Sequence, residues 1–204
     1  MSQEVADSLL GVVLAGGPGR RLGGNKPQRR LGGVRLVDWA LKALGQVCRR
    51  LVVSTQDPAD LADLPYPVIG DRWPGQGPLA ALTTVFMETQ AEAVLVLAVD
   101  LPLARPALLR LLAQGPGEDR ARAPLSPGGM EPLMAYYHRS CLPAAMRLLK
   151  AGDRRPRMLL KAVGANMIPV EEVARVDPEG ISLFNVNYPA DLERAEELLR
   201  QWSV

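Results

Sequence analysis

The chain has 204 residues and a mass of 22.1 kDa, which is the size of one domain. Apolar residues make up 48% and charged residues 23%, so the chain can build a core and is not broadly disordered. Its 24 basic and 22 acidic residues give a formal net charge of +2, which excludes electrostatic nucleic-acid binding as the default function and leaves a local basic patch open.

The first half of the chain alternates apolar runs with segments of helical spacing. Leu9–Leu14 is an apolar run that predicts a strand, and Ala15-Gly16-Gly17 begins a glycine-rich loop after it. Strands are also predicted at Leu51–Val53, Val68–Ile69 and Ala93–Val99, and helices at Leu36–Leu44, Pro78–Met87 and Pro106–Ala113. The alternation predicts an α/β fold in which a mostly parallel sheet has helices on both faces.

The second half of the chain is less regular. Strands are predicted at Ala121–Leu125, Leu133–Tyr137, Asn166–Val170 and Leu183–Val186, with a turn at Pro127-Gly128-Gly129. Helices are predicted at Leu142–Lys150, Pro156–Val163 and Pro189–Trp202. The sequence contains no internal repeat and no long linker, which favours a single domain.

Cysteine and histidine are scarce, and apolar runs are short. Cys48 and Cys141 are far apart, and His138 is the single histidine, which excludes a Cys/His zinc site and a disulfide framework. We expect two buried thiols, a structural His138 and a cytoplasmic protein. The run Ala93–Val99 is far shorter than the roughly 20 residues of a membrane span. Residues 1–7 contain two acids and no basic residue, unlike a secretory signal.

The segment LAGGPGRRLGGNK, from Leu14 to Lys26, is the most informative stretch. Its five glycines allow the backbone to approach a phosphate, and its two arginines and one lysine supply the charge that a triphosphate needs. It is not a Walker motif, because Pro27 follows Lys26, and not a dinucleotide fingerprint, because Leu22 takes the third glycine position. We expect a phosphate loop of another type; the alternative is a flexible loop with solvated arginines.

Two acidic residues follow predicted strands. Asp100 closes the buried strand Ala93–Val99, where a carboxylate points into the ligand crevice of an α/β sheet and can hold Mg²⁺ against phosphates. Asp71 follows Val68–Ile69 and precedes Gly77 at a helix start. The alternative for both is structural, with Asp100 capping a helix and Asp71 capping a turn.

Polar residues also gather late in the chain. The segment Gly152-Asp153-Arg154-Arg155 contains paired arginines, which suit a phosphate-bearing substrate. Asn185 and Asn187 flank the end of the predicted strand Leu183–Val186, where their amides could bond backbone or metal-bound water. Taken without the other motifs, these residues could equally form a solvated surface.

Together these motifs resemble the molybdenum cofactor guanylyltransferase family of nucleotidyltransferases. The family signature L-A-G-G-x-x-x-R-x-G-G-x-x-K is matched by Leu14-Ala15-Gly16-Gly17, Arg21, Gly23-Gly24 and Lys26, with one residue fewer before the lysine and no acid there. Its D…GPL, C-D-x-P, G-[DE]-R-R and N-x-N-x-P-x-D-L segments resemble Asp71 with Gly77-Pro78-Leu79, Val99-Asp100-Leu101-Pro102, Gly152–Arg155 and Asn185–Leu192. Glu131-Pro132-Leu133 resembles the start of its acceptor half. Ser54 stands where the family normally has Asn, and Val99 where it has Cys.

The resemblance covers Gly11 to Leu192 and implies a three-layer α/β/α nucleotidyltransferase fold, Rossmann-like, with a nucleotide-binding half at about 9–104 and an acceptor-binding half at about 105–204. It implies transfer of GMP from GTP to molybdopterin carrying molybdenum, with release of pyrophosphate and with Mg²⁺ as cofactor. The implied catalytic residues are Arg21, Lys26 and Asp100, with Asp100 as the metal ligand. The implied nucleotide-binding residues are Leu14, Ala15, Gly16, Gly17, Lys26, Ser54, Asp71, Gly77 and Asp100. The implied acceptor-binding residues are Arg154, Arg155, Asn185 and Asn187.

The resemblance also bears on partners. GTP and Mo-molybdopterin are the implied substrates, and other cofactor-biosynthesis proteins and chaperones of apo-molybdoenzymes are candidate contacts. Neither nucleic acid nor a membrane is expected as a partner. Two alternatives stay open: a transferase of the same fold that uses CTP or a sugar 1-phosphate, and a non-catalytic nucleotide-binding protein.

Overall fold

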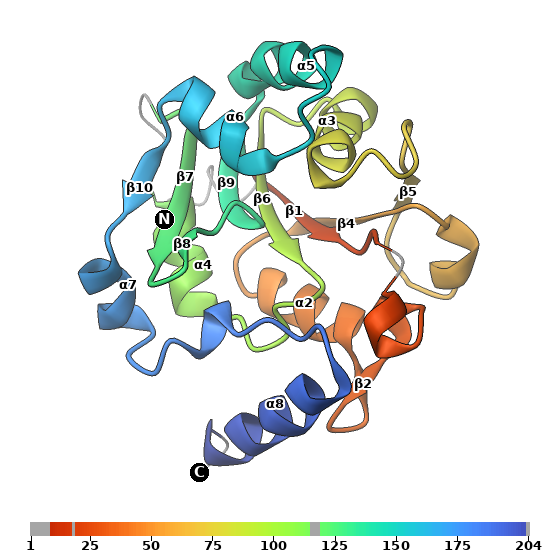
Figure 1. Cartoon of the computed structure of the whole chain (residues 1–204), viewed down its shortest axis with the longest axis vertical. Coiled ribbons are helices and arrows are strands. Elements are labelled where there is room, and N and C mark those ends of the chain that lie inside the picture. Colours follow the sequence, from red (N-terminus) through yellow and green to blue (C-terminus); the bar gives the residue numbers. More distant parts are fainter. Residues whose placement is uncertain (1–8, 18, 115–118, 203–204) are drawn as a thin grey trace.

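The computed structural model describes residues 9–17, 19–114 and 119–202 (Figure 1). The prediction made from residues 1–7 therefore lies outside the described part. The strands are β1 (Leu9–Leu14), β2 (Arg30–Leu31), β3 (Val34–Arg35), β4 (Arg50–Thr55), β5 (Val68–Gly70), β6 (Ala93–Ala98), β7 (Ala121–Ser126), β8 (Gly129–Met130), β9 (Met134–His138) and β10 (Asn166–Ile168).

Seven α-helices and five 3₁₀-helices connect the described strands. The α-helices are α2 (Leu36–Leu44), α3 (Pro78–Thr89), α4 (Pro106–Ala113), α5 (Leu142–Lys150), α6 (Pro156–Val163), α7 (Val170–Val176) and α8 (Pro189–Trp202). The 3₁₀-helices are η1 (Arg20–Leu22), η2 (Lys26–Gln28), η3 (Pro58–Leu61), η4 (Arg139–Cys141) and η5 (Ile181–Leu183). None of the helices in the described ranges combines the length and apolarity that a membrane-spanning segment requires.

The main sheet has the strand order β10-β7-β9-β6-β1-β4-β5, with β8 paired to β7, and β2 and β3 form a separate hairpin. β9 runs antiparallel to both of its neighbours, and the other neighbouring pairs of this order are parallel. The prediction of a mostly parallel sheet is confirmed. Because β1, β4, β5 and β6 run in the same direction, their carboxyl ends meet at one edge, where such sheets bind ligands.

The core lies on both faces of the sheet. Side chains of β1 alternate between the two faces: Leu9 and Val13 pack with α2 and α4, whereas Leu10 and Val12 pack with α3 and α5. Figure 1 shows α3, α5 and α6 on one side of the sheet and α2, α4, α7 and α8 on the other. The prediction of helices on both faces is therefore confirmed.

Two of the predicted strands are corrected by the structure. The predicted strand Leu183–Val186 is wrong: Leu183 ends η5, and the Val186 N–H donates to the Asp100 carbonyl at 2.8 Å rather than to a sheet neighbour. The predicted strand Asn166–Val170 stops at Ile168, because Pro169 has no N–H to donate and serves as the N-cap of α7. The β2–β3 hairpin was not predicted from the sequence.

The cysteines and the histidine have structural roles, as predicted. Cys48 and Cys141 are free and buried, and burial raises their thiol pKa values to about 12 and about 11. Such thiols stay protonated and unreactive at neutral pH. His138 is the N-cap of η4, and its Nδ1 accepts a hydrogen bond from the Ser140 N–H at 3.2 Å.

Candidate active site

A pocket of about 750 Å³ opens at the edge where β1, β4, β5 and β6 end. Its walls come from the loops that follow these strands and from segments distant in sequence. The lining residues are Leu14, Gly16, Gly17, Gly19, Arg21, Leu22, Lys26, Gln56, Asp71, Gly75, Gly77, Pro78, Ala81, Ala98, Val99, Asp100, Leu133 and Asn187.

The glycine-rich loop leaves the sheet one residue after β1. The Leu14 carbonyl accepts from the Val99 N–H at 3.0 Å, and the Ala15 N–H donates to the Ser54 carbonyl at 2.8 Å. The loop then turns on Gly19, which has a φ of +52° and accepts at its carbonyl from the Leu22 and Gly24 N–H groups at 2.9 Å each. A Cβ on Gly19 would lie 2.9 Å from the Cβ of Lys26, so the turn requires glycine.

Lys26 connects the loop to two other parts of the chain. Its Nζ donates to the Asn187 Oδ1 at 2.7 Å and to the Asp100 Oδ2 at 3.2 Å. The single residue before it, Asn25, has a φ of 42° and a ψ of 54°, a left-handed conformation that asparagine tolerates better than most residues. The loop is one residue shorter than the family signature, yet this turn brings Lys26 into the pocket.

Asp100 has one oxygen paired and one free for a ligand. The Oδ2 atom accepts from Lys26, whereas Oδ1 is buried without a hydrogen-bond partner among the described residues. The predicted alternative of a helix cap is not what the structure shows, because α4 begins after Arg105 with no side-chain cap. A buried, unpartnered carboxylate oxygen is a fitting ligand for a cation, since leaving it unsatisfied costs free energy.

The described residues offer no protein-only metal cage around Asp100. Nowhere in the described ranges do three His, Cys, Asp or Glu side chains come together as a metal site. The carboxylate of Asp100 and the amide oxygen of Asn187 both accept from the Lys26 ammonium, and both are hard oxygen atoms of the kind that bind Mg²⁺. One carboxylate together with substrate phosphates is the way Mg²⁺ is commonly held, so the residues fit that ion.

Asp71 faces the glycine loop across the pocket. The Asp71 Oδ2 would lie 3.8 Å from a Cβ built on Gly16, and its Oδ1 accepts from the Ser54 hydroxyl at 3.1 Å. Burial raises the pKa of the Asp71 carboxyl, and the hydrogen bond from Ser54 works in the opposite direction. Ser54 itself is only 1% exposed, so it lies behind Asp71 and does not line the pocket.

The arginine pair lies beside the pocket rather than inside it. Gly77, with a φ of +81°, packs against Arg154: a Cβ on Gly77 would lie 3.6 Å from the Arg154 carbonyl oxygen. The Arg154 guanidinium also donates to the side-chain oxygen of Gln76. Arg155 donates to both carboxylate oxygens of Asp153, at 2.9 and 2.6 Å, and this pairing lowers the pKa of Asp153 to about 2.

The C-terminal segment contributes Asn187 to the pocket. The Asn187 N–H donates to the Asp191 Oδ2 at 2.8 Å, which fixes it at the start of α8. Asn185 is exposed, and its amide donates to the Leu183 carbonyl at 3.2 Å. The next aromatic residue, Tyr188, is 48% exposed, and its ring centroid lies 5.3 Å from the guanidinium carbon of Arg21.

The structure thus brings together most of the predicted site. The predicted residues that line the pocket are Leu14, Gly16, Gly17, Arg21, Lys26, Asp71, Gly77, Asp100 and Asn187. Ala15 and Ser54 are buried behind the wall, Arg154 supports it, and Arg155 and Asn185 lie outside the lining. Gln56 lines the pocket and was missed, although its place just after β4 is the same signal that identified Asp71 and Asp100.

Comparison with known proteins adds to this geometry. Residues 11–167 match the family model described as a MobA-like NTP transferase domain. A probable molybdenum cofactor guanylyltransferase of Chloroflexus aggregans is 34% identical over 197 residues, 94% of this chain and 95% of that protein. A molybdenum cofactor guanylyltransferase of Desulfosudis oleivorans is 31% identical over 95% of this chain and 97% of its own length. The crystal structure of molybdopterin-guanine dinucleotide biosynthesis protein A from Archaeoglobus fulgidus has a TM-score of 0.80 and 30% identity, with 94% of this chain and 99% of that one covered.

Proposed function

The chain belongs to the molybdenum cofactor guanylyltransferase family of MobA-like NTP transferases, and on this basis we propose that it transfers GMP from GTP to molybdopterin carrying molybdenum, with release of pyrophosphate. One observation carries the proposal. Lys26, Asp100 and Asn187, from three distant parts of the chain, meet through hydrogen bonds of 2.7 and 3.2 Å in a pocket at the carboxyl ends of β1 and β6.

Lys26 and Arg21 would bind the triphosphate. An ammonium group has three donors, and Lys26 uses two of them on Asp100 and Asn187, which leaves one for a phosphate oxygen. Arg21 lines the same pocket and carries a second positive charge to it. Fixed donors of this kind stabilise the charge that develops on the phosphates in the transition state.

The family typically uses a divalent metal ion. We assign Mg²⁺ to Asp100, whose buried Oδ1 has no hydrogen-bond partner among the described residues. When bound, the ion would neutralise charge on the phosphate oxygens of the nucleotide. In the absence of substrate, the Lys26 ammonium balances the negative charge of Asp100 from the other carboxylate oxygen.

The base would be read by the glycine loop and Asp71. The Leu14 carbonyl and the Ala15 N–H already bond within the sheet. The backbone groups that would contact the base are therefore those of Gly16 and Gly17. Guanine presents two adjacent donors, its N1–H and its amino group, and the Asp71 carboxylate opposite Gly16 can accept both. Cytosine offers one amino donor beside an acceptor nitrogen, which a carboxylate repels. Ser54 would orient Asp71 through its 3.1 Å hydrogen bond.

The acceptor would approach from the side of Arg154 and Arg155. Arg154 packs against Gly77 at the pocket wall, and Arg155 stands at the same turn. Asn187 joins this second half of the chain, residues 105–204, to the nucleotide half, residues 9–104, through Lys26. Arg155 and Asn185 would have to leave Asp153 and the Leu183 carbonyl, respectively, to contact the acceptor.

The reaction needs no covalent enzyme intermediate. An oxygen of the acceptor phosphate attacks the α-phosphorus of GTP in line, the new P–O bond forms, and the bond to the β-phosphate bridge breaks to release pyrophosphate. The described residues that line the pocket include no Ser, Cys or His, which fits direct transfer. Rate acceleration would then come from positioning and from charge stabilisation.

The test is the second-order rate constant of pyrophosphate release for each of the four NTPs, with Mg²⁺ and Mo-molybdopterin present. We expect GTP to exceed CTP and UTP on the order of a hundredfold, since each unpaired buried polar group costs about 1–3 kcal/mol. Asp71→Asn is the matched variant: its amide oxygen accepts only one of the two guanine donors, so the preference should shrink about tenfold.

The outcomes separate the alternatives. Equal use of CTP and GTP would reject guanine specificity and favour the cytidylyl transferase. Binding of GTP with no pyrophosphate release would favour a non-catalytic nucleotide-binding protein. The two free, buried cysteines suit the reducing cytoplasm, which we propose as the compartment.

A further inference from the structure

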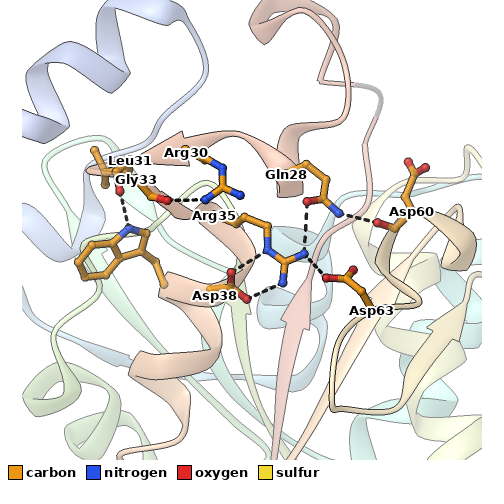
Figure 2. A network of polar contacts seen from close by, with 9 residues as sticks. Gln28, Arg30, Leu31, Gly33, Arg35, Asp38, Asp60 and Asp63 are labelled. Carbon is orange, nitrogen blue, oxygen red and sulfur yellow. Dashed lines mark hydrogen bonds and ion pairs between the residues drawn. The ribbon is translucent and has the colours of Figure 1, made fainter.

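A polar network beside the hairpin connects three segments of the chain (Figure 2). Its centre is Arg35, the last residue of β3 and the N-cap of α2, whose side chain is 16% exposed. The guanidinium donates to both oxygens of Asp38, at 2.7 and 3.1 Å, and to the Asp63 Oδ2 at 2.6 Å. These contacts fix the guanidinium between α2 and the turn that follows η3.

Gln28 is the member of this network that belongs to η2. Its Oε1 accepts from the Arg35 Nη1 at 3.3 Å, and its Nε2 donates to the Asp60 carbonyl at 2.6 Å. Figure 2 shows the amide held between these two partners. Both polar atoms of the Gln28 amide therefore bond to residues that do not line the nucleotide pocket.

The contacts of Gln28 add to other anchors of η2, since the adjoining Arg29 donates to the Gly23 and Gly24 carbonyls at 2.7 and 3.2 Å and accepts at its own carbonyl from the Leu36 N–H at 2.8 Å. The helix itself spans only three residues, from Lys26 to Gln28, and a 3₁₀ turn of this length is weakly fixed by its own hydrogen bonds. Its N-cap, Asn25, makes no side-chain cap and sits in a left-handed conformation. A small rotation of η2 would move the Nζ of Lys26, at the end of a four-carbon stem, relative to Asp100 and Asn187 and to the pocket it lines.

We propose that Arg35, acting through Gln28, is a positioning residue that fixes where the Lys26 ammonium lies in the nucleotide pocket. The proposal rests on the proposed function only in that Lys26 must contact a nucleotide phosphate. Neither Arg35 nor Gln28 lines the pocket, so their effect on nucleotide use passes through η2. Asp38 and Asp63 keep the guanidinium in place whether or not Gln28 is present.

The experiment is a double-mutant cycle between Gln28→Ala and Lys26→Met. Gln28→Ala alone should lower kcat/KM for pyrophosphate release about tenfold, because small misplacements of a catalytic group are costly. In the Lys26→Met background the same change should have no further effect, since there is no ammonium left to position. Arg35→Lys, which keeps the charge but lacks the planar fork, should reproduce the Gln28→Ala loss.

Arg30→Ala is the matched control. Arg30 is exposed in the same hairpin, and its guanidinium donates to the Gly33 carbonyl at 2.5 Å, within the hairpin turn. Removing it takes away one arginine beside the network without touching Gln28, so kcat/KM should stay within about twofold of wild type. Thermal unfolding of every variant shows whether the fold is retained.

Two results would overturn the positioning role: no loss on Gln28→Ala, or an equal loss in the presence and in the absence of Lys26. The cycle is repeated on the dissociation constant of Mg²⁺–GTP, which needs binding but no transfer. Wild-type protein that binds GTP without releasing pyrophosphate rejects the proposed function and leaves the dissociation constants to decide, those of the cycle on Gln28 and that of Arg35→Lys on Arg35. Wild-type protein that binds no nucleoside triphosphate overturns both.

Discussion

Replacing Lys26 by methionine removes the ammonium that joins the glycine loop to β6 and to the C-terminal segment. Methionine keeps an unbranched stem, which matters because the Cβ of Lys26 packs against Gly19 at the turn of the loop. The change therefore deletes two hydrogen bonds, to Asp100 at 3.2 Å and to Asn187 at 2.7 Å, and disturbs little else.

Removing the Lys26 ammonium should lower the stability of the fold. Lys26 and Asp100 are 12% and 22% exposed, so solvent screens their ion pair only partly. A hydrogen bond to a charged group contributes about 1.5–3 kcal/mol, and two are lost, so we expect a loss of about 3 kcal/mol in the free energy of unfolding, the lower end because solvent screens the pair in part. For a chain of this size that lowers Tm by about 6–12 °C. With a typical stability of about 5–15 kcal/mol, the variant stays almost entirely folded at 25 °C.

The cost to activity is larger. Loss of one fixed charge from a developing phosphate oxyanion costs about 3–4 kcal/mol, or roughly 10²–10³ in kcat/KM. Because the folded fraction hardly changes, a loss of this size reports on the transition state and not on unfolding.

The assay measures initial rates of pyrophosphate release at 25 °C with varied GTP, alongside Tm by circular dichroism. Lys161→Met is the control, since Lys161 is an exposed lysine on α6. It should match wild type in both measurements. A kcat/KM within about threefold of wild type for Lys26→Met would remove Lys26 from the site, and an activity loss that tracks the unfolded fraction would make its role structural.

Three further substitutions test other parts of the site. Asp100→Asn should weaken the response to added Mg²⁺ more than it weakens GTP binding without metal, and a metal titration identical to wild type would leave Asp100 only as the partner of Lys26. Asp71→Asn should raise Tm at pH 7, because burial raises the pKa of Asp71 and the ionised carboxylate therefore destabilises the folded state. The difference in Tm from wild type should be absent below the unfolded pKa of 3.8 and should grow as the pH rises through the folded pKa. A gain that does not depend on pH would contradict this origin. Arg155→Ala should raise the KM for Mo-molybdopterin about tenfold and leave the KM for GTP near normal, and a defect confined to GTP would assign Arg155 to the nucleotide.

The parts of the fold that the sequence predicts well are those whose pattern reports burial. β1 and β6 are continuous apolar runs with every residue buried, and their ends lie within one residue of the prediction. The helices α2, α4, α5, α6 and α8 begin and end where apolar spacing and Pro at the first turn indicate. Local patterns of this kind are enough to place the ends of a helix or strand without knowledge of its tertiary contacts.

The failures share a physical cause, which is bonding between distant segments. The sequence around Val186 resembles that of a strand, but the Val186 N–H donates to the Asp100 carbonyl and not to a neighbouring strand. For the site, spacing and resemblance predicted Lys26 and Asp100, and both line the pocket. The end of β4 also indicated a pocket residue, but no local signal tells that Ser54 would donate its hydroxyl to Asp71 and that Gln56 would line the pocket in its place. The partner of each polar group depends on the assembled fold.

The bond between Lys26 and Asn187 spans 161 residues of chain. Contacts of such wide separation form late in folding, because the entropy of closing a long loop must first be offset by other contacts. All strands of the sheet, through β10, are synthesised before Asn187 leaves the ribosome. An emerging chain can therefore pair its strands and pack both cores while its lysine still lacks its closest partner. We therefore expect the pocket around Lys26 to be completed only after the sheet has formed, when the segment that contains Val186 and Asn187 binds to Asp100 and Lys26.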